Sequence, residues 1–202
     1  ASSATIYAHT YTRANDEISG VIGGDESSVP DSWRFSIDVA RAWEREFDQV
    51  SLDRTRKIAL RSAMTLSPDP GGVFDTLRGL ARRGLGGSAG DGRQFLSWIH
   101  HTDFIAAIEW MIDHEEINGV VNVASPNPLS NAEFMRTLRE TCGAPFGLPA
   151  TAWMLELGAL FLKTETELIM KSRRVVPRKL IEHGFTFRFP EWRHAALDLC
   201  RS

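Results

Sequence analysis

The sequence has little that would indicate secretion, a membrane or a nucleic acid. Only two cysteines occur among its 202 residues, and the wide separation of Cys142 and Cys200 favours reduced, structural thiols in a cytoplasmic protein over a disulfide. No apolar run approaches the roughly 20 residues that a membrane span needs, and the chain does not start with the basic segment of a secretory signal. The formal net charge of -3 argues against a nucleic-acid partner, because such proteins usually carry a basic surface.

A glycine-rich turn for a dinucleotide is also missing. No G-x-G-x-x-G motif follows a predicted strand. The glycines of residues 84–92 come after a predicted helix, so they do not form the turn that places a pyrophosphate at a helix N-terminus. We therefore expect that most of the residues that bind any dinucleotide lie outside this chain, which begins with Ala1 rather than Met.

What the chain does contain is an alternation of strand and helix patterns. Apolar residues at helical spacing predict helices over 31–48, 73–83, 102–112 and from a capping box at Ser130 and Glu133 to Cys142. Residues 2–8 are predicted to be the end of a buried strand followed by a loop, and further strands are predicted at 57–66, 94–99 and 119–124. Residues 9–30 are predicted to form a long loop. This order, at βαβ spacing, predicts an α/β fold with a doubly wound, parallel, Rossmann-like sheet.

The pattern of predicted elements changes after Pro145. Helical patterns at 152–162, 165–176 and 177–183, a short strand at 185–189 and a last helix at 191–200 predict a small α-rich C-terminal subdomain. We therefore divide the chain into the C-terminal portion of a Rossmann-like domain, residues 1–144, and a subdomain of residues 145–202. A basic run at the start of the subdomain's second half is interpreted as a solvated helix face rather than an anion site; it consists of Lys171, Arg173, Arg174, Arg178 and Lys179.

Three stretches of the chain together carry a family signal. They are residues 2–7 (SSATIY), 61–72 (RSAMTLSPDPGG) and 84–103 (GLGGSAGDGRQFLSWIHHTD). The first two resemble a strand end and a strand-turn of extended short-chain dehydrogenases. The third closely resembles the signature of an atypical subgroup, the YfcH-like epimerase family proteins, and residues 131–134 and 174–185 are similar to that subgroup's C-terminal domain.

The resemblance implies an epimerase-like oxidoreductase that uses NAD or NADP. Its substrate would be a small molecule such as a nucleotide sugar, and the helix at 31–48 would pair in a homodimer. Relatives of this kind begin with a strand, a glycine-rich turn and a helix that hold the cofactor, so the resemblance places that segment on the order of 100 residues upstream. The chain is thus expected to start in the middle of the fold.

The family's catalytic residues are only partly matched. Short-chain dehydrogenases use a Tyr with a Lys four positions later, because the phenol pKa near 10 must fall for proton transfer at neutral pH, and a Ser that orients the substrate. By resemblance Trp33 and Ile37 stand at the Tyr and Lys positions, and neither can transfer a proton. This leaves Ser3 and Tyr7 as catalytic candidates, and these two with Ser2 as cofactor contacts. The alternative is that they are strand-end residues satisfied by backbone contacts.

Arg61 is a candidate for substrate binding because a buried arginine needs a partner. It stands at the end of a predicted buried strand, at the sheet edge where open α/β folds bind ligands. A substrate phosphate or carboxylate would serve as that partner. An internal ion pair with Asp103 or Glu44 would serve equally well, and both interpretations stay open.

A dense polar and aromatic cluster follows the glycine-rich stretch. Arg93 has the geometry to bind a phosphate, Gln94 to hydrogen-bond a sugar or base, and Trp98 to stack on a ring, so all three are candidate substrate contacts. The alternative is that Trp98 belongs to the core and that His100 orients the turn by bonding to Asp103. Adjacent histidines point to opposite sides of a strand, so no metal site is expected.

Two functions therefore remain open. The first is a nucleoside-diphosphate-sugar epimerase-like, NAD(P)-dependent oxidoreductase with an unknown substrate. The second is a non-catalytic dinucleotide-binding or interaction protein that kept the fold and lost the Tyr/Lys pair.

Overall fold

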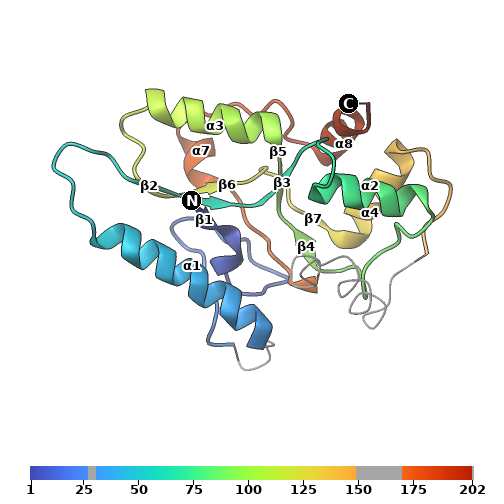
Figure 1. The fold of residues 1–202 in the computed structure, drawn as a ribbon, viewed down its shortest axis with the longest axis horizontal. Helices are drawn as coiled ribbons and strands as arrows, with labels where there is room; N and C mark the ends of the chain where they lie inside the picture. The colour runs from blue at the N-terminus through green and yellow to red at the C-terminus, as the bar shows by residue number, and fades with distance from the viewer. Residues whose placement is uncertain (27–30, 149–169, 202) are drawn as a thin grey trace.

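The computed structural model describes residues 1–26, 31–148 and 170–201. Figure 1 shows a central sheet with helix α1 (Asp31–Gln49) on one side and helix α3 (His101–Asp113) on the other. No helix within these residues is long and apolar enough to cross a membrane.

The central sheet confirms the predicted parallel α/β fold. Its strands are β1 (Ser2–Ser3), β2 (Ile58–Ser62) and β6 (Gly119–Val123), in the order β1-β2-β6. Both pairings are parallel, and Ser3 lies opposite Ser62 in the register. The carboxyl ends of all three strands therefore meet at one edge of the sheet. A short 3-10 turn, η1 (Ala4–Ile6), follows β1 at that edge.

The single strand predicted over 57–66 is wrong, because the chain changes partners at Ala63. The Ala63 N–H still donates to the Val123 carbonyl at 3.0 Å, whereas the Met64 N–H donates to the Ser97 carbonyl at 3.2 Å. The second half of the stretch forms β3 (Met64–Leu66), which leaves the central sheet.

The strand predicted over 94–99 divides in the same way. β4 (Phe95–Leu96) pairs antiparallel with β7 (Leu129–Ser130), while β5 (Trp98–His100) pairs parallel with β3. Ser97 lies between the two strands, and its carbonyl accepts the Met64 N–H. Two small two-stranded sheets thus extend the parallel sheet toward its carboxyl side.

The helices predicted before residue 145 are confirmed within two residues at each end. Besides α1 and α3 they are α2 (Val73–Arg82) and α4 (Asn131–Thr141). The predicted cap of α4 is also present, since the Ser130 hydroxyl accepts the Glu133 N–H at 3.3 Å.

The C-terminal part contains α7 (Arg178–Glu182) and α8 (Trp192–Arg201), close to two of the predicted helices. The helix predicted at 152–162 and the first part of that at 165–176 lie outside the described residues. Residues 171–176 are not helical, because their backbone is drawn into contacts with other segments: the Arg173 N–H donates to the Phe95 carbonyl at 2.9 Å.

The strand predicted at 185–189 is absent from the described structure. The carboxylate of Asp103 accepts the backbone N–H groups of Arg188 and Phe189, each at 2.8 Å. These amides are therefore paired with a side chain rather than with a neighbouring strand, and Asp103 is fixed at the start of α3.

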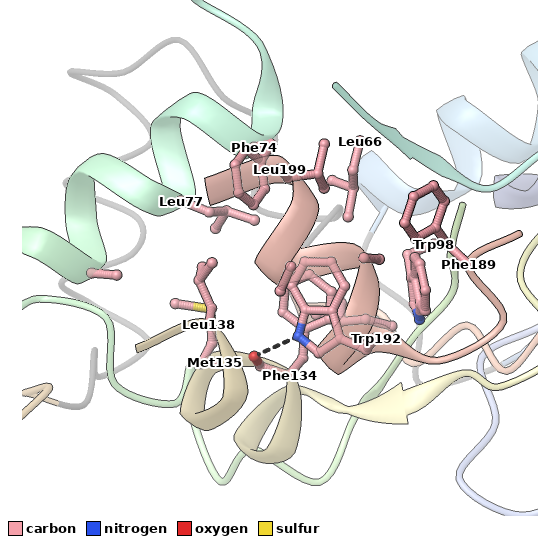
Figure 2. Close-up of a cluster of buried hydrophobic side chains, with 14 residues drawn as sticks. Leu66, Phe74, Leu77, Trp98, Phe134, Met135, Leu138, Phe189, Trp192 and Leu199 are labelled. Carbon is pink, nitrogen blue, oxygen red and sulfur yellow. Dashed lines mark hydrogen bonds between the residues drawn. The ribbon is translucent and has the colours of Figure 1, made fainter. Parts of the chain in front are cut away.

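The largest apolar core lies between α2, α4 and α8 (Figure 2). The Trp192 ring of α8 stacks on Phe134 of α4 with ring centroids 4.0 Å apart, and its indole N–H donates to the Phe134 carbonyl at 3.0 Å. Trp98 reaches the same core from β5 and meets Trp192 edge-on. Burial of rings of this size contributes strongly to stability.

Candidate functional site

A cavity of about 170 Å³ opens at the carboxyl edge of the central sheet. It lies where β1 and β2 end, which is the place where open parallel sheets bind ligands. Hydroxyl and cationic side chains from separate segments line it, among them Ser3, Thr5, Ser62, Ser97, Lys171 and Arg173.

Two cations reach this cavity from the segment that follows the undescribed residues 149–169. Lys171 is fully buried and its Nζ donates to the Thr5 carbonyl at 2.9 Å. The Arg173 Nη2 donates to the Thr5 hydroxyl at 2.6 Å. Both side chains are thus held against the turn that follows β1.

The same segment is anchored to the long loop after β1. The His9 Nδ1 accepts the Ser172 N–H at 2.8 Å, and the Asn15 N–H donates to the Arg174 carbonyl at 2.6 Å. Burial and, next, the nearby Lys171 charge lower the pKa of His9 below its usual value. The neutral ring that accepts the Ser172 N–H is therefore favoured.

The interpretation of the basic run as a solvated helix face is wrong for Lys171. The residue is 0% exposed and follows directly on Met170, the last helical residue before it, so it does not lie on a solvated helix face.

Ser3 is at this cavity, but Tyr7 is not among the described residues that line it. The Ser3 hydroxyl accepts the Thr5 N–H at 3.2 Å and so caps η1. Tyr7 is 0% exposed, and its hydroxyl accepts from the Arg61 Nη1 and donates to the Asn122 Oδ1, both at 2.9 Å. The structure therefore places these two catalytic candidates in different surroundings.

Burial raises the pKa of Tyr7 above 10, although Arg61 and Asn122 act in the opposite direction. A phenol that transfers a proton near neutral pH needs the reverse shift. The Tyr7 hydroxyl is thus held as a neutral hydrogen-bonding group between Arg61 and Asn122.

Arg61 forms the internal ion pair with Glu44, one of the two partners expected from the sequence. Its Nε and Nη2 donate to the Glu44 carboxylate at 2.8 and 2.6 Å, and both side chains are nearly buried. The Ser2 hydroxyl donates to the same carboxylate at 2.6 Å. Although burial opposes it, hydrogen bonds from Arg61 and Ser2 lower the pKa of Glu44. Ser2 and Arg61 therefore tie β1 and β2 to α1.

The candidates after the glycine-rich stretch are not gathered at the cavity. Gln94 is 2% exposed, and its Nε2 donates to the Ala89 carbonyl at 2.9 Å, which holds the glycine-rich loop together. Arg93 is exposed and lies over the Tyr11 ring at 5.9 Å. Trp98 is 0% exposed within the core, so neither face of its ring is open to a ligand.

His100 orients the start of α3, but not through Asp103 as expected. Its Nδ1 accepts the Thr102 N–H at 3.1 Å, which makes it the N-cap of the helix. Among the described residues no group of three or more histidine, cysteine or acidic side chains is placed to hold a metal ion.

Comparisons with known proteins agree with this architecture. Residues 150–199 match a family described as a domain of unknown function, DUF1731. The chain is 30% identical over 176 residues to the mouse epimerase family protein SDR39U1, covering 87% of this chain and 58% of the relative. It is 31% identical over 176 residues to YfhF of Bacillus subtilis, covering 86% and 56%. The chain thus spans little more than half the length of these relatives.

Two solved structures are similar over the whole chain. Human SDR39U1 (isoform 2) with NADPH superposes with a TM-score of 0.80 at 25% identity, and this chain covers 64% of it. A nucleoside-diphosphate sugar epimerase from Corynebacterium glutamicum gives a TM-score of 0.73 at 27% identity, with 37% of that chain covered.

Proposed function

We propose that this chain, which belongs to the epimerase family of atypical short-chain dehydrogenases, forms the substrate side of an NAD(P)-dependent, epimerase-like oxidoreductase. The observation that carries the proposal is the cavity with Lys171 and Arg173 at the carboxyl ends of β1 and β2. In this proposal residues 1–144 are the C-terminal portion of the Rossmann-like domain, and residues 145–202 are the small C-terminal subdomain.

The cavity fits only one end of a dinucleotide. A volume of about 170 Å³ is below the roughly 300 Å³ at which pockets for drug-sized ligands begin. Ser3, at the end of β1, would contact the nicotinamide end, while the chain has no glycine-rich turn for the pyrophosphate. When bound, the cofactor would supply reversible hydride transfer.

The same cavity favours a substrate with an anionic group. Arg173 presents a planar fork of donors that matches phosphate or carboxylate oxygens, and Lys171 adds a second positive charge. The phosphates of a nucleotide sugar would satisfy this chemistry. Ser62 would offer a hydroxyl group to the neutral part of the substrate, whereas the Ser97 hydroxyl already donates to the Arg173 carbonyl and accepts the Val175 N–H.

The remaining site assignments are tested by turnover. If Ser3 and Tyr7 take part in catalysis, Tyr7→Phe abolishes turnover although the ring still fills its buried place. Substrate contacts by Arg61, Arg93 and Gln94 require that a ligand reach beyond the cavity. Full turnover in Tyr7→Phe would remove Tyr7 from the catalytic residues.

The second candidate function is binding of a dinucleotide without catalysis. Ile37, at the position of the usual catalytic lysine, is 0% exposed, and the raised Tyr7 pKa offers no replacement base. Fluorescence titration of the full-length protein with NADPH and NADH separates the cases. Binding together with turnover of a nucleotide sugar supports the oxidoreductase, and binding without turnover of any such substrate supports the second function. The absence of binding would refute both.

A homodimer through α1 is part of the same proposal. Phe35, Trp43 and Phe47 recur on this helix at intervals of eight and four residues and are 71%, 54% and 37% exposed, so they would form an apolar row of the kind that pairs at an interface. Light scattering of the full-length protein and of a Trp43→Glu variant tests it, and a monomeric wild type would contradict it.

A further inference from the structure

We propose that Cys142 and Cys200 are a modification site at which a small-molecule disulfide, such as oxidised glutathione, forms a reversible intramolecular disulfide between α4 and α8. Nothing in the proposed oxidoreductase function requires this reaction. It rests on a separate pair of side chains, away from the cavity that carries that function.

The two thiols lie against each other although 58 positions separate them in the chain. Cys142 caps the C-terminal end of α4, and Cys200 lies in the last turn of α8. Their Sγ atoms are 2.7 Å apart, so only a small approach separates them from a disulfide bond of about 2.05 Å. Both are free in this structure.

The helices that carry the thiols are already fixed against each other. Phe134 of α4 and Trp192 of α8 stack with an interplanar angle of 10°, and both belong to the core in Figure 2. Cys142 and Cys200 pack against this same core and are half-buried. The folded chain therefore holds the thiols in contact before any oxidant arrives. The second thiol does not have to find the first by diffusion of the chain, as it would in the unfolded protein.

The surroundings keep Cys142 in its thiol form. Burial, then the hydrogen bond and charge of the neighbouring Cys200, raise the pKa of Cys142, while Arg82 and Arg78 act in the opposite direction. Because the thiolate is the nucleophile, attack by Cys142 needs a partner that is already close. Once either cysteine carries a mixed disulfide, the other Sγ lies next to it and can complete the exchange.

The disulfide forms by two thiol–disulfide exchange steps. One of the two protein thiolates attacks one sulfur of oxidised glutathione, forms a mixed disulfide and releases one glutathione thiolate. The other protein thiolate then attacks the protein sulfur of the mixed disulfide, forms the protein disulfide and releases the second glutathione thiolate. The two protons of the protein thiols end on the two glutathione molecules. The protein loses two electrons, and the oxidised glutathione gains them.

The bridge would close a loop that contains both cavity cations, Lys171 and Arg173. Crosslinks of this span stabilise mainly by restricting the unfolded chain. We expect the oxidised protein to unfold at a midpoint roughly 5–15 °C higher than the reduced protein.

The test is incubation of the folded, full-length protein with oxidised or reduced glutathione, followed by alkylation and peptide mapping without reductant. The expected product is one crosslinked pair of peptides that contain Cys142 and Cys200, with neither residue alkylated. Crosslinking in urea should be slower by roughly tenfold or more, because the unfolded chain no longer holds the thiols together.

Two single variants test the pairing. In Cys142→Ser and in Cys200→Ser the remaining cysteine should carry at most one glutathionyl group, and no internal crosslink should form. Neither variant should show the oxidant-dependent rise in unfolding midpoint. Two alkylatable cysteines in the oxidised wild type, or glutathione retained on Cys200 without a crosslink, would overturn the proposal.

Discussion

The buried ring of His100 should make the stability of the fold depend on pH. The ring is 0% exposed, stacks on Phe189 with centroids 4.0 Å apart and caps α3 through Nδ1. The His101 ring lies beside that of His100, and the Asp198 carboxylate lies 3.4 Å from the Nε2 of His100. Burial, followed by the charge of His101, lowers the pKa of His100 from 6.5 to about 4, although Asp198 and Asp103 act in the opposite direction.

The sign of the pH effect follows from this shift. Between pH 6.5 and about 4 the unfolded chain binds a proton at His100 that the folded chain does not, so acid favours unfolding. The stabilising contribution is complete above pH 6.5 and is lost as the pH falls to about 4. The full loss is about 3 kcal/mol at 1.36 kcal/mol per pH unit, and about 2 kcal/mol of it has occurred by pH 5.

The variant His100→Asn removes the titration and keeps an acceptor for the Thr102 N–H, because Asn is a good N-cap. Urea unfolding at pH 8 and pH 5 should show that the wild type loses about 2 kcal/mol more stability than the variant. His183→Asn, at an exposed histidine, is the matched control and should behave as the wild type. Equal pH dependence in the wild type and His100→Asn would show that His100 does not stay neutral in the folded chain.

Three further predictions concern the packing of the core, the buried ion pair and the cap of α4. Trp192→Ala should lower the free energy of unfolding by about 3–5 kcal/mol, because the indole fills the core between α2, α4 and α8, and urea unfolding measures it. Glu44→Gln should cost about 3 kcal/mol because it leaves the buried Arg61 charge without its carboxylate, and the double variant with Arg61→Met should recover part of the loss. Ser130→Ala should cost about 1 kcal/mol through the lost cap of α4, whereas Ser67→Ala, at a half-buried position that caps no helix, should cost less.

The helices could be predicted from the sequence because local signals specify them. Apolar spacing and the Ser130 cap lie within a few residues of each other, so α1, α2 and α4 were found nearly at their observed bounds. The change of partner at Ala63 could not be predicted in this way, since a run of strand-forming residues does not record which neighbour each half will pair with.

The site was harder to predict because it is assembled from distant segments. Lys171 and Arg173 follow a helical pattern, and only their contacts with Thr5, more than 160 positions earlier, place them at the sheet edge. The family resemblance directed attention to Ser3, which does line the cavity, and to Trp98, which the core buries. The adjacency of Cys142 and Cys200 likewise depends on how α4 and α8 pack, which no local pattern encodes.

We propose that the cavity at the ends of β1 and β2, with Lys171 and Arg173, binds the substrate of an NAD(P)-dependent protein. The most direct test of this proposal is calorimetric titration of a nucleoside-diphosphate sugar into the full-length protein saturated with NADPH. We expect saturable binding that Arg173→Gln weakens about tenfold or more, because one charge-assisted contact is lost, and that the adjacent control Arg174→Gln leaves unchanged. Equal affinities in the wild type and Arg173→Gln would contradict it.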